Sequence, residues 1–215
     1  MDLNFTEASA LAVIDRQVGA IAENFTPAQY EIIRQVIYAS ADLEYQSLLR
    51  FSQGALAKGA TALTAVLPII IDVPEIQVSI VPKLQQTFAN PVYCCATTGS
   101  EEVKDGGTKA SNGLNILGAK YPHGIYIIGQ DPVAMSMMMD LIEQKMIEPS
   151  LVIATPPTLV NSENKQRLKS FSTPNVHIIG AKGGANIATA IFNSLLQLAW
   201  QVDQQNQQSL SETVL

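Results

Sequence analysis

The feature that most constrains this chain is a set of five short apolar runs, each of which ends in Gly, Pro, Thr, Lys or Asp. Apolar and polar residues do not alternate within the runs, and this pattern is typical of strands that are buried on both faces of a sheet. The runs cover residues 67–72, 91–98, 124–131, 151–157 and 176–184. They predict a mainly parallel sheet of about five strands.

Helical patterns separate and flank these runs. Asp131 followed by Pro132 is typical of a helix start, because the carboxylate caps the first turn and proline fits its first position. Thr26 begins a capping-box pattern at another helix start. The predicted helices cover residues 6–23, 26–40, 52–65, 131–146 and 162–171, and a long final helix begins just after Gly183 and Gly184. Strands that alternate with helices predict a three-layer α/β fold with helices flanking the sheet.

The length and composition of the chain suit one domain with a sizeable core, in 215 residues. We assign residues 1–200 to this domain and expect the polar segment 201–215 to be disordered. Charged residues make up 15% of the chain and apolar residues 47%, which favours burial of apolar surface between subunits. The net charge of −6 argues against nucleic-acid binding. Since no apolar run could span a membrane and no basic segment precedes an apolar N-terminal one, we expect a soluble, cytoplasmic protein.

The cysteines and histidines do not indicate a metal site or a redox centre. Cys94 and Cys95 are adjacent in the second predicted strand, so we expect free thiols that point to opposite faces. His123 lies in a predicted turn and His177 within a predicted strand, and we expect no bound metal. The signatures of P-loops, dinucleotide-binding folds, serine hydrolases and zinc proteases are absent from the sequence.

The carboxyl ends of the predicted strands are the expected ligand site, because loops converge there and helix N-termini point inward. The residues predicted at this rim are Asp72, Thr97, Thr98 and the segments 129–132, 155–158 and 182–184. Lys109, Lys165 and Lys182 lie near the same rim and favour a ligand with carboxylates or phosphates. Two alternatives remain open: turn residues mark every strand end for conformational reasons, and surface lysines are commonly only solvated.

Six stretches spread along the chain carry a more specific signal. They are residues 37–44 (IYASADLE), Asp72 with the helix that follows it, 107–109 (GTK), 128–135 (IGQDPVAM), 156–165 (PPTLVNSENK) and 180–185 (GAKGGA). Together and in this order, they resemble the precorrin-8X methylmutase family of cobalamin biosynthesis, over nearly the whole chain to about Trp200. The resemblance implies a homodimer that binds a tetrapyrrole with many carboxylates in a deep site at the subunit interface. It also implies an isomerase that moves a methyl group from C11 to C12 of the macrocycle without a cofactor or a metal from the protein.

The resemblance also implies roles for the residues at matching positions. Tyr38 stands where the family has a histidine that protonates or hydrogen-bonds the ring, and Tyr38 is therefore the candidate catalytic residue. The candidate substrate-binding residues are Ser40, Asp72, Thr108, Lys109, Gly129, Gln130, Thr158, Lys182, Gly183 and Gly184. A tyrosine hydroxyl has an ordinary pKa of about 10, against about 6.5 for histidine, so it can donate a hydrogen bond but is a poorer proton shuttle at neutral pH.

Other positions in the same predicted region also depart from the family's pattern. Lys109 replaces an arginine and loses the bidentate fork that suits carboxylates. Gln130 and Asp131 replace asparagine and alanine, Val133 replaces threonine, and Ala181 replaces an arginine. Asp131 adds negative charge beside a polyanionic ligand unless it is used as a helix cap.

Two functions follow from these observations. The first is a methylmutase acting on precorrin-8X or its cobalt form, with Tyr38 positioning a proton while lysines and main-chain amides hold carboxylates. The second is a protein of the same fold that binds or carries a tetrapyrrole without turning it over. Both use one site, so turnover and not binding separates them. A different reaction on an unrelated anionic metabolite is a third possibility, because fold alone does not fix function.

Overall fold

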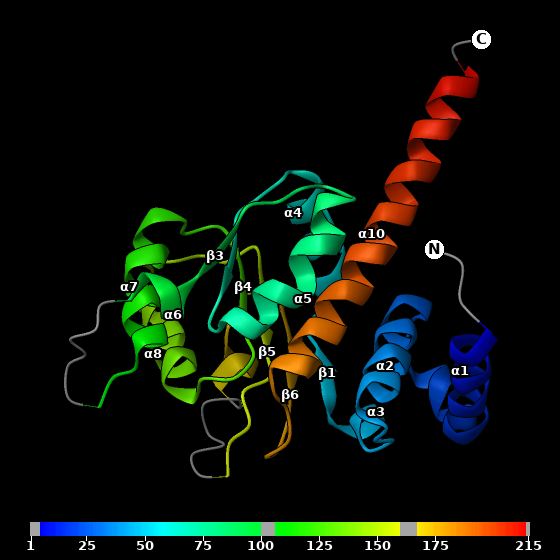
Figure 1. The fold of residues 1–215 in the computed structure, drawn as a ribbon, viewed down its shortest axis with the longest axis horizontal. Coiled ribbons are helices and arrows are strands. Elements are labelled where there is room, and N and C mark those ends of the chain that lie inside the picture. Colours follow the sequence, from blue (N-terminus) through cyan, green and yellow to red (C-terminus); the bar gives the residue numbers. More distant parts are fainter. Residues whose placement is uncertain (1–4, 100–105, 160–166, 214–215) are drawn as a thin grey trace.

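One six-stranded sheet forms the centre of the protein, with helices on both of its faces (Figure 1). The computed structural model describes residues 5–99, 106–159 and 167–213. The strands are β1 (Leu49–Phe51), β2 (Ile69–Ile71), β3 (Val92–Cys94), β4 (Ile125–Ile128), β5 (Leu151–Ala154) and β6 (Asn175–Ile178), in the spatial order β1-β6-β5-β4-β2-β3. Every neighbouring pair in this sheet is parallel except β1 with β6. The predicted, mainly parallel α/β sheet is confirmed.

The five apolar runs correspond to strands β2 to β6, with only Asn175 of β6 outside its run, whereas β1 is a strand that they do not predict. It pairs antiparallel with β6, and Leu49 lies opposite Ile178. With only three residues, one of which is Arg50, β1 has no continuous apolar run to mark it. Its pairing covers the edge of β6 that would otherwise present unpaired backbone groups.

The second apolar run is shorter as a strand than the sequence predicts. β3 ends at Cys94, and Cys95 begins the four-residue helix α6 (Cys95–Thr98). The Thr97 and Thr98 hydroxyls donate hydrogen bonds to the Cys94 carbonyl oxygen, at 3.1 and 2.8 Å, and stabilise this turn. The prediction that both cysteines lie in one strand is therefore wrong. The prediction of buried free thiols is confirmed, and burial raises the pKa of Cys95.

Two helices begin where their capping signals predict. Thr26 and Gln29 form the reciprocal capping box of α2, and Asp131 caps α8 with Pro132 as its first residue. The helices are α1 (Phe5–Val18), η1 (Gly19–Asn24), α2 (Pro27–Ser40), α3 (Tyr45–Leu48), α4 (Ala55–Thr64), α5 (Pro74–Gln85), α6 (Cys95–Thr98), α7 (Lys109–Lys120), α8 (Pro132–Glu143), η2 (Leu168–Ser170) and α10 (Ala185–Thr213). The first predicted helix changes to a 3-10 helix at Gly19, where φ is 55°. Of the helix predicted over 162–171, residues 162–166 lie outside the described residues, and the short helix η2 occupies its end.

The side chains of each buried strand point alternately into two cores. Ile69 and Ile71 of β2 pack in a core with residues of α1, α2, α4, α5 and α10, whereas Ile70 packs with residues of α7 and α8. All three isoleucines are fully buried. Burial on both faces explains the unbroken apolar runs and confirms the three-layer arrangement.

The last helix, α10, is longer than the sequence predicts. It continues to Thr213 and projects from the body of the molecule (Figure 1), so the expectation of a disordered segment from residue 201 is wrong for the described residues. Glutamine has good helix propensity, and the Gln207 side chain donates to the Asp203 carboxylate at 2.6 Å, one turn earlier. Neither α10 nor any other helix in the described part of the chain is long and apolar enough to cross a membrane.

Candidate active site

Asp72 lies at the carboxyl-end rim of the sheet, directly after β2, and is fully buried. Its carboxylate accepts hydrogen bonds from the backbone N–H groups of Gly129, Gln130 and Asp131, at 3.1, 2.7 and 2.8 Å. These residues follow β4, the neighbouring strand. Burial raises the pKa of the Asp72 carboxyl, and the three N–H donors oppose the rise. Asp72 therefore fixes the position of the loop after β4.

Asp131 joins this loop to the start of α7. One carboxylate oxygen accepts from the N–H groups of Val133 and Ala134, at 2.7 and 3.1 Å, and the other accepts from the Thr108 hydroxyl at 2.5 Å. Its negative charge is thus used as a helix cap. Thr108 in turn caps α7, and the exposed Lys109 is the first residue of that helix.

The loops after β5 and β6 are bonded to each other at the same rim. The N–H of Gly184 donates to the Thr155 carbonyl oxygen at 2.7 Å, and the Thr155 hydroxyl donates to the Gly184 carbonyl oxygen at 3.0 Å. The Thr158 N–H donates to the Ala181 carbonyl oxygen at 3.0 Å. Gly183 has a φ of 149°, and a Cβ there would lie 2.0 Å from the Thr155 carbonyl oxygen, so only glycine fits.

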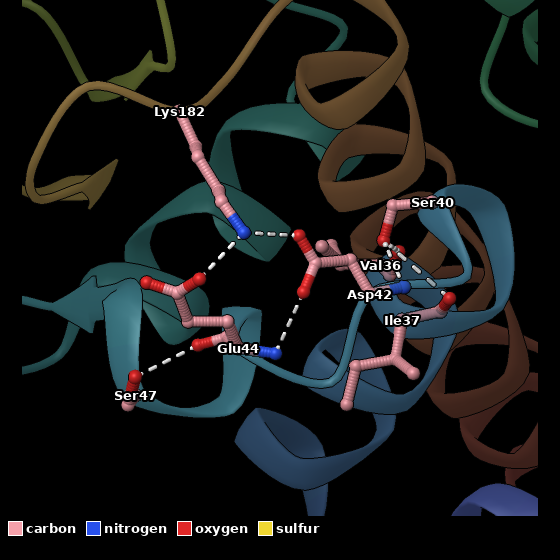
Figure 2. Close-up of polar contacts among 7 residues, drawn as sticks. All are labelled: Val36, Ile37, Ser40, Asp42, Glu44, Ser47 and Lys182. Atoms are coloured by element: carbon pink, nitrogen blue, oxygen red, sulfur yellow. Dashed lines mark hydrogen bonds and ion pairs between the residues drawn. The ribbon is translucent and has the colours of Figure 1, made fainter.

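Lys182 lies within this glycine-rich loop and contacts two carboxylates in the connection between α2 and α3 (Figure 2). Its Nζ atom is 2.5 Å from Asp42 Oδ2 and 2.5 Å from Glu44 Oε2. The hydrogen bond from Lys182 lowers the pKa of Asp42, and the two carboxylates raise the pKa of Lys182. The sequence predicts a lysine that binds substrate carboxylates, whereas here its charge is compensated by the chain itself.

Tyr38, the candidate catalytic residue, borders a groove whose lining does not include Lys182. Its side chain is 42% exposed and lines an open groove of about 800 Å³. The groove is bordered mainly by α2 and α10, with Lys83 of α5 and Glu7 of α1. Its polar lining includes Glu31, Arg34, Gln35, Asn186, Thr189, Asn193 and Gln197. A volume of this size lies within the range of about 300–1,000 Å³ that is usual for ligand sites.

Asn186 connects the groove to the rim. It lines the groove, and its Oδ1 atom lies 2.9 Å from the position that a Cβ on Gly184 would take. The same position is 3.9 Å from Gln130 Oε1. A Cβ on Gly129 would lie 3.0 Å from the Cα of Ala185, the first residue of α10. The loops after β4 and β6 therefore meet at the end of the groove that holds Asn186.

The predicted site residues thus fall into linked groups rather than a single pocket. Contacts join Asp72 to Gly129 and Gln130, and Thr108 joins the same loop through Asp131. Hydrogen bonds of Thr155 and Thr158 join the loop after β5 to the loop that carries Gly183 and Gly184. Ser40 supports the carboxylate pair, because its hydroxyl oxygen accepts the Asp42 N–H at 3.3 Å. Lys165 lies outside the described residues. Among the described residues, no three His, Cys, Asp or Glu side chains are grouped so that they could hold a metal ion.

Three residues of this region were missed by the sequence reasoning: Asp42, Glu44 and Asn186. The first two stand inside the stretch 37–44 that carries the family resemblance, and their acidic side chains so near a predicted site were the available signal. Asn186 is one of several polar residues at the start of a long helix, and nothing in its spacing distinguishes it.

The fold and the rim define the class of protein: an α/β protein whose loops converge at the carboxyl ends of a parallel sheet. The family model for precorrin-8X methylmutase matches residues 6–198, and the chain belongs to this family. The resemblance stated from the sequence motifs is therefore confirmed.

Relatives and a solved structure agree with this assignment. The cobalt-precorrin-8 methylmutase of Synechocystis sp. is 32% identical over 206 residues, which cover 89% of this chain and 94% of the relative. That of Methanocaldococcus jannaschii is 31% identical over 189 residues, covering 86% and 87%. The crystal structure of the precorrin-8X methylmutase from Thermus thermophilus matches with a TM-score of 0.81 at 27% identity, covering 91% of this chain and 96% of that chain. These names are those of isomerases, which favours the enzyme over the non-catalytic carrier.

Proposed function

We propose that this protein is a methylmutase-type isomerase that moves a methyl group from C11 to C12 of precorrin-8X or cobalt-precorrin-8 in cobalamin biosynthesis. The observation that carries this proposal is the family match over residues 6–198. The relative in Pseudomonas aeruginosa is named for precorrin-8X, at 28% identity over 176 residues, whereas those in Synechocystis sp. and Methanocaldococcus jannaschii are named for the cobalt form. Both forms therefore belong in the test.

Tyr38 is the hydrogen-bond donor to the macrocycle in this proposal. The rearrangement is intramolecular: the bond from the methyl carbon to C11 breaks, the bond to C12 forms, and the ring's π electrons shift. The protein has to hold the macrocycle and to control a proton on it, and no external group is consumed. Tyr38 can do this because a phenol hydroxyl is a hydrogen-bond donor and the Tyr38 side chain lines an open groove.

The rim holds the carboxylate side chains of the macrocycle. Lys109 and Gln130 are exposed there, and the beginning of α10 after Gly184 offers backbone N–H groups to an anion. The Thr158 hydroxyl has no hydrogen-bond partner among the described residues but is buried, so it donates to a carboxylate only if the loop shifts to expose it. Asp72 does not touch the substrate in this scheme but holds the loop that carries Gln130.

We further propose that the enzyme works in the cytoplasm as a homodimer in which a second subunit covers the groove. The groove is open, and Tyr38 is too exposed in one subunit to exclude water from a reacting ring. The exposed apolar residues Phe5, Val78 and Val202 lie on α1, α5 and α10, the helices that border the groove. Sedimentation velocity should give the mass of a dimer, and a monomer at micromolar concentration would contradict this part of the proposal.

Conversion of a labelled substrate tests the reaction directly. Precorrin-8X and cobalt-precorrin-8, each carrying a ¹³C-labelled methyl group at C11, are incubated with the purified protein and followed by absorption and by NMR. The label should move to C12 in at least one of them. If neither substrate is converted over hours at stoichiometric enzyme, the proposal fails.

Variants at Tyr38 test its role in that reaction. Tyr38→Phe should lower kcat by about 100-fold or more, the loss typical of a positioned proton donor, while substrate binding stays within a few-fold. Tyr38→His, unlike Tyr38→Phe, should retain turnover, because imidazole titrates near neutral pH. Tyr30→Phe is a matched control on the same helix: it removes the hydroxyl that donates to Asp15 at 2.7 Å, outside the groove, and should leave kcat unchanged.

A further inference from the structure

The two carboxylates that contact Lys182 are held in a fixed turn. Ala41 has a left-handed φ of 54°, which ends α2 and turns the chain toward α3. The Glu44 N–H donates to Asp42 Oδ1 at 2.9 Å, and the Asp42 N–H donates to the Ser40 hydroxyl oxygen at 3.3 Å. The Ser40 hydroxyl in turn donates to the Val36 carbonyl oxygen at 2.8 Å (Figure 2). Asp42 is therefore oriented by α2, the helix that carries Tyr38.

The other side of the contact is a glycine-rich loop that hydrogen bonds hold to the loop after β5, at Thr155 and Thr158. Gly180, Gly183 and Gly184 have φ values of 77°, 149° and 127°, a region that glycine reaches easily and other residues rarely adopt. Lys182 stands between them, and its side chain bridges the loop to the turn after α2, 140 residues away in sequence from Asp42. The ion pair thus joins the anion-binding side of the rim to the end of the Tyr38 helix.

The charge of this cluster does not suit direct binding of a substrate carboxylate. Two carboxylates face one ammonium group, so the cluster carries a net negative charge at neutral pH. Asp42 Oδ2 and Glu44 Oε2 both lie 2.5 Å from Nζ and take up two of its three donors. A polyanionic macrocycle would be repelled by the remaining negative charge.

We propose that Asp42 and Glu44 are positioning residues that act through Lys182 to hold the loop 180–184 against the end of α2, in the geometry that binds substrate carboxylates. The side chains are 32%, 54% and 42% exposed for Asp42, Glu44 and Lys182, so the pair adds little to global stability. Its role is to order the loop locally, which fixes the position of the start of α10 relative to Tyr38. The kinetic part of this proposal rests on the proposed isomerase function, whereas the loop-ordering part does not.

Hydrogen exchange measured by mass spectrometry tests loop order without substrate. Lys182→Met and the double variant Asp42→Asn with Glu44→Gln should raise the exchange rates of the amides of residues 180–184 to a similar extent. The urea midpoint should stay close to that of the unaltered protein in both. Arg167→Met is a matched control, because Arg167 also contacts two carboxylates, those of Asp140 and Glu143, at 3.1 and 2.8 Å. It should leave exchange in the loop unchanged.

Steady-state kinetics in a double-mutant cycle separates positioning from direct binding. If the lysine acts only through the carboxylates, both variants should raise KM by about 3- to 10-fold with kcat nearly unchanged, and combining them should add nothing further. Lys182→Arg should retain most of the low KM. If Lys182 instead binds the substrate, removing the two carboxylates would free it and lower KM, and Lys182→Met would still raise KM in that background.

The two proposals fail in different ways. If hydrogen exchange in the loop is unchanged in both variants, the positioning role is refuted, whether or not the protein has catalytic activity. If the loop exchanges faster in the variants as expected but the unaltered protein converts neither substrate, the isomerase function is refuted and the positioning role of the ion pair is retained.

Discussion

Replacing Asp72 with asparagine should destabilise the protein by about 2–4 kcal/mol, because one buried group orients a whole loop. In the best orientation, the amide oxygen would keep the bonds from Gln130 and Asp131, and the amide nitrogen would face the N–H of Gly129. Leaving that buried donor unsatisfied costs about 1–3 kcal/mol, and the two remaining bonds each lose about 1 kcal/mol with the charge. Removal of a buried charge offsets part of this loss.

Thermal and urea unfolding measure this effect. For a chain of this size, the expected change corresponds to a fall in Tm of roughly 5–15 °C. Asp140→Asn is the control, because that carboxylate is half-exposed and contacts Arg167 at the surface, where ion pairs contribute about 0–1 kcal/mol. A free energy of unfolding for Asp72→Asn within about 0.5 kcal/mol of the unaltered protein would refute the reasoning.

The pH dependence of the same comparison has a defined sign. The pKa of Asp72 is raised above 3.8 in the folded protein. At pH values between 3.8 and the raised pKa, the folded state therefore binds more protons than the unfolded state. Relative to Asp72→Asn, the unaltered protein should therefore gain stability as the pH falls from the raised pKa toward 3.8, and lose it as the pH rises through that window. The opposite slope would show that the three N–H donors outweigh burial.

Three further predictions concern other parts of the fold. Gly113→Ala should destabilise the protein by about 3 kcal/mol or more, because its Cβ would lie 1.9 Å from the Cys95 carbonyl oxygen. Gly118→Ala in the same helix should cost less than about 1 kcal/mol, because the nearest contact there is a side-chain atom at 3.2 Å. Similar urea curves for the two variants would contradict this. Asp42→Asn should lower the free energy of unfolding at neutral pH by less than about 1 kcal/mol, as expected for an exposed ion pair, and this small difference should vanish below the lowered pKa of Asp42. A difference that persists after Asp42 is protonated would be the contrary result in pH-dependent unfolding. Removal of residues 201–215 should change the free energy of unfolding by less than about 1 kcal/mol relative to the full chain, because the described side chains there are largely exposed. Circular dichroism should show a loss of helical signal. A large fall in stability would mean that this end of the helix makes packing contacts that the fold needs.

The sheet was predictable because the pattern that marks each buried strand lies within a few consecutive residues. Ile69, Ile70 and Ile71 are apolar on both faces, and this leaves an unbroken run in the sequence. Helix starts such as Thr26 and Asp131 were predictable for the same reason, since a cap acts on residues two or three positions away. Strand β1 left no such trace, because it is a short edge strand defined by its pairing with β6.

The site was predictable in outline but not in its pairing. The rule for parallel sheets placed Asp72 and the loop after β4 at the same rim, although 57 residues separate Asp72 from Gly129 in the chain. Nothing local indicates that Lys182 contacts Asp42, because that contact depends on where α2 ends against the sheet. The sequence showed the positive charge and could not show the carboxylates that compensate it.

The length of α10 has a practical consequence for work on this enzyme. The helix starts at the rim with Ala185 and ends at Thr213, so its 29 residues extend over about 44 Å. A fluorophore, an affinity tag or a surface linker attached at its far end would sit about 18 Å along the helix from Gln201, which lines the groove. Enzyme that is immobilised or labelled this way should keep its groove accessible, and the helix would set a defined distance for distance-dependent fluorescence.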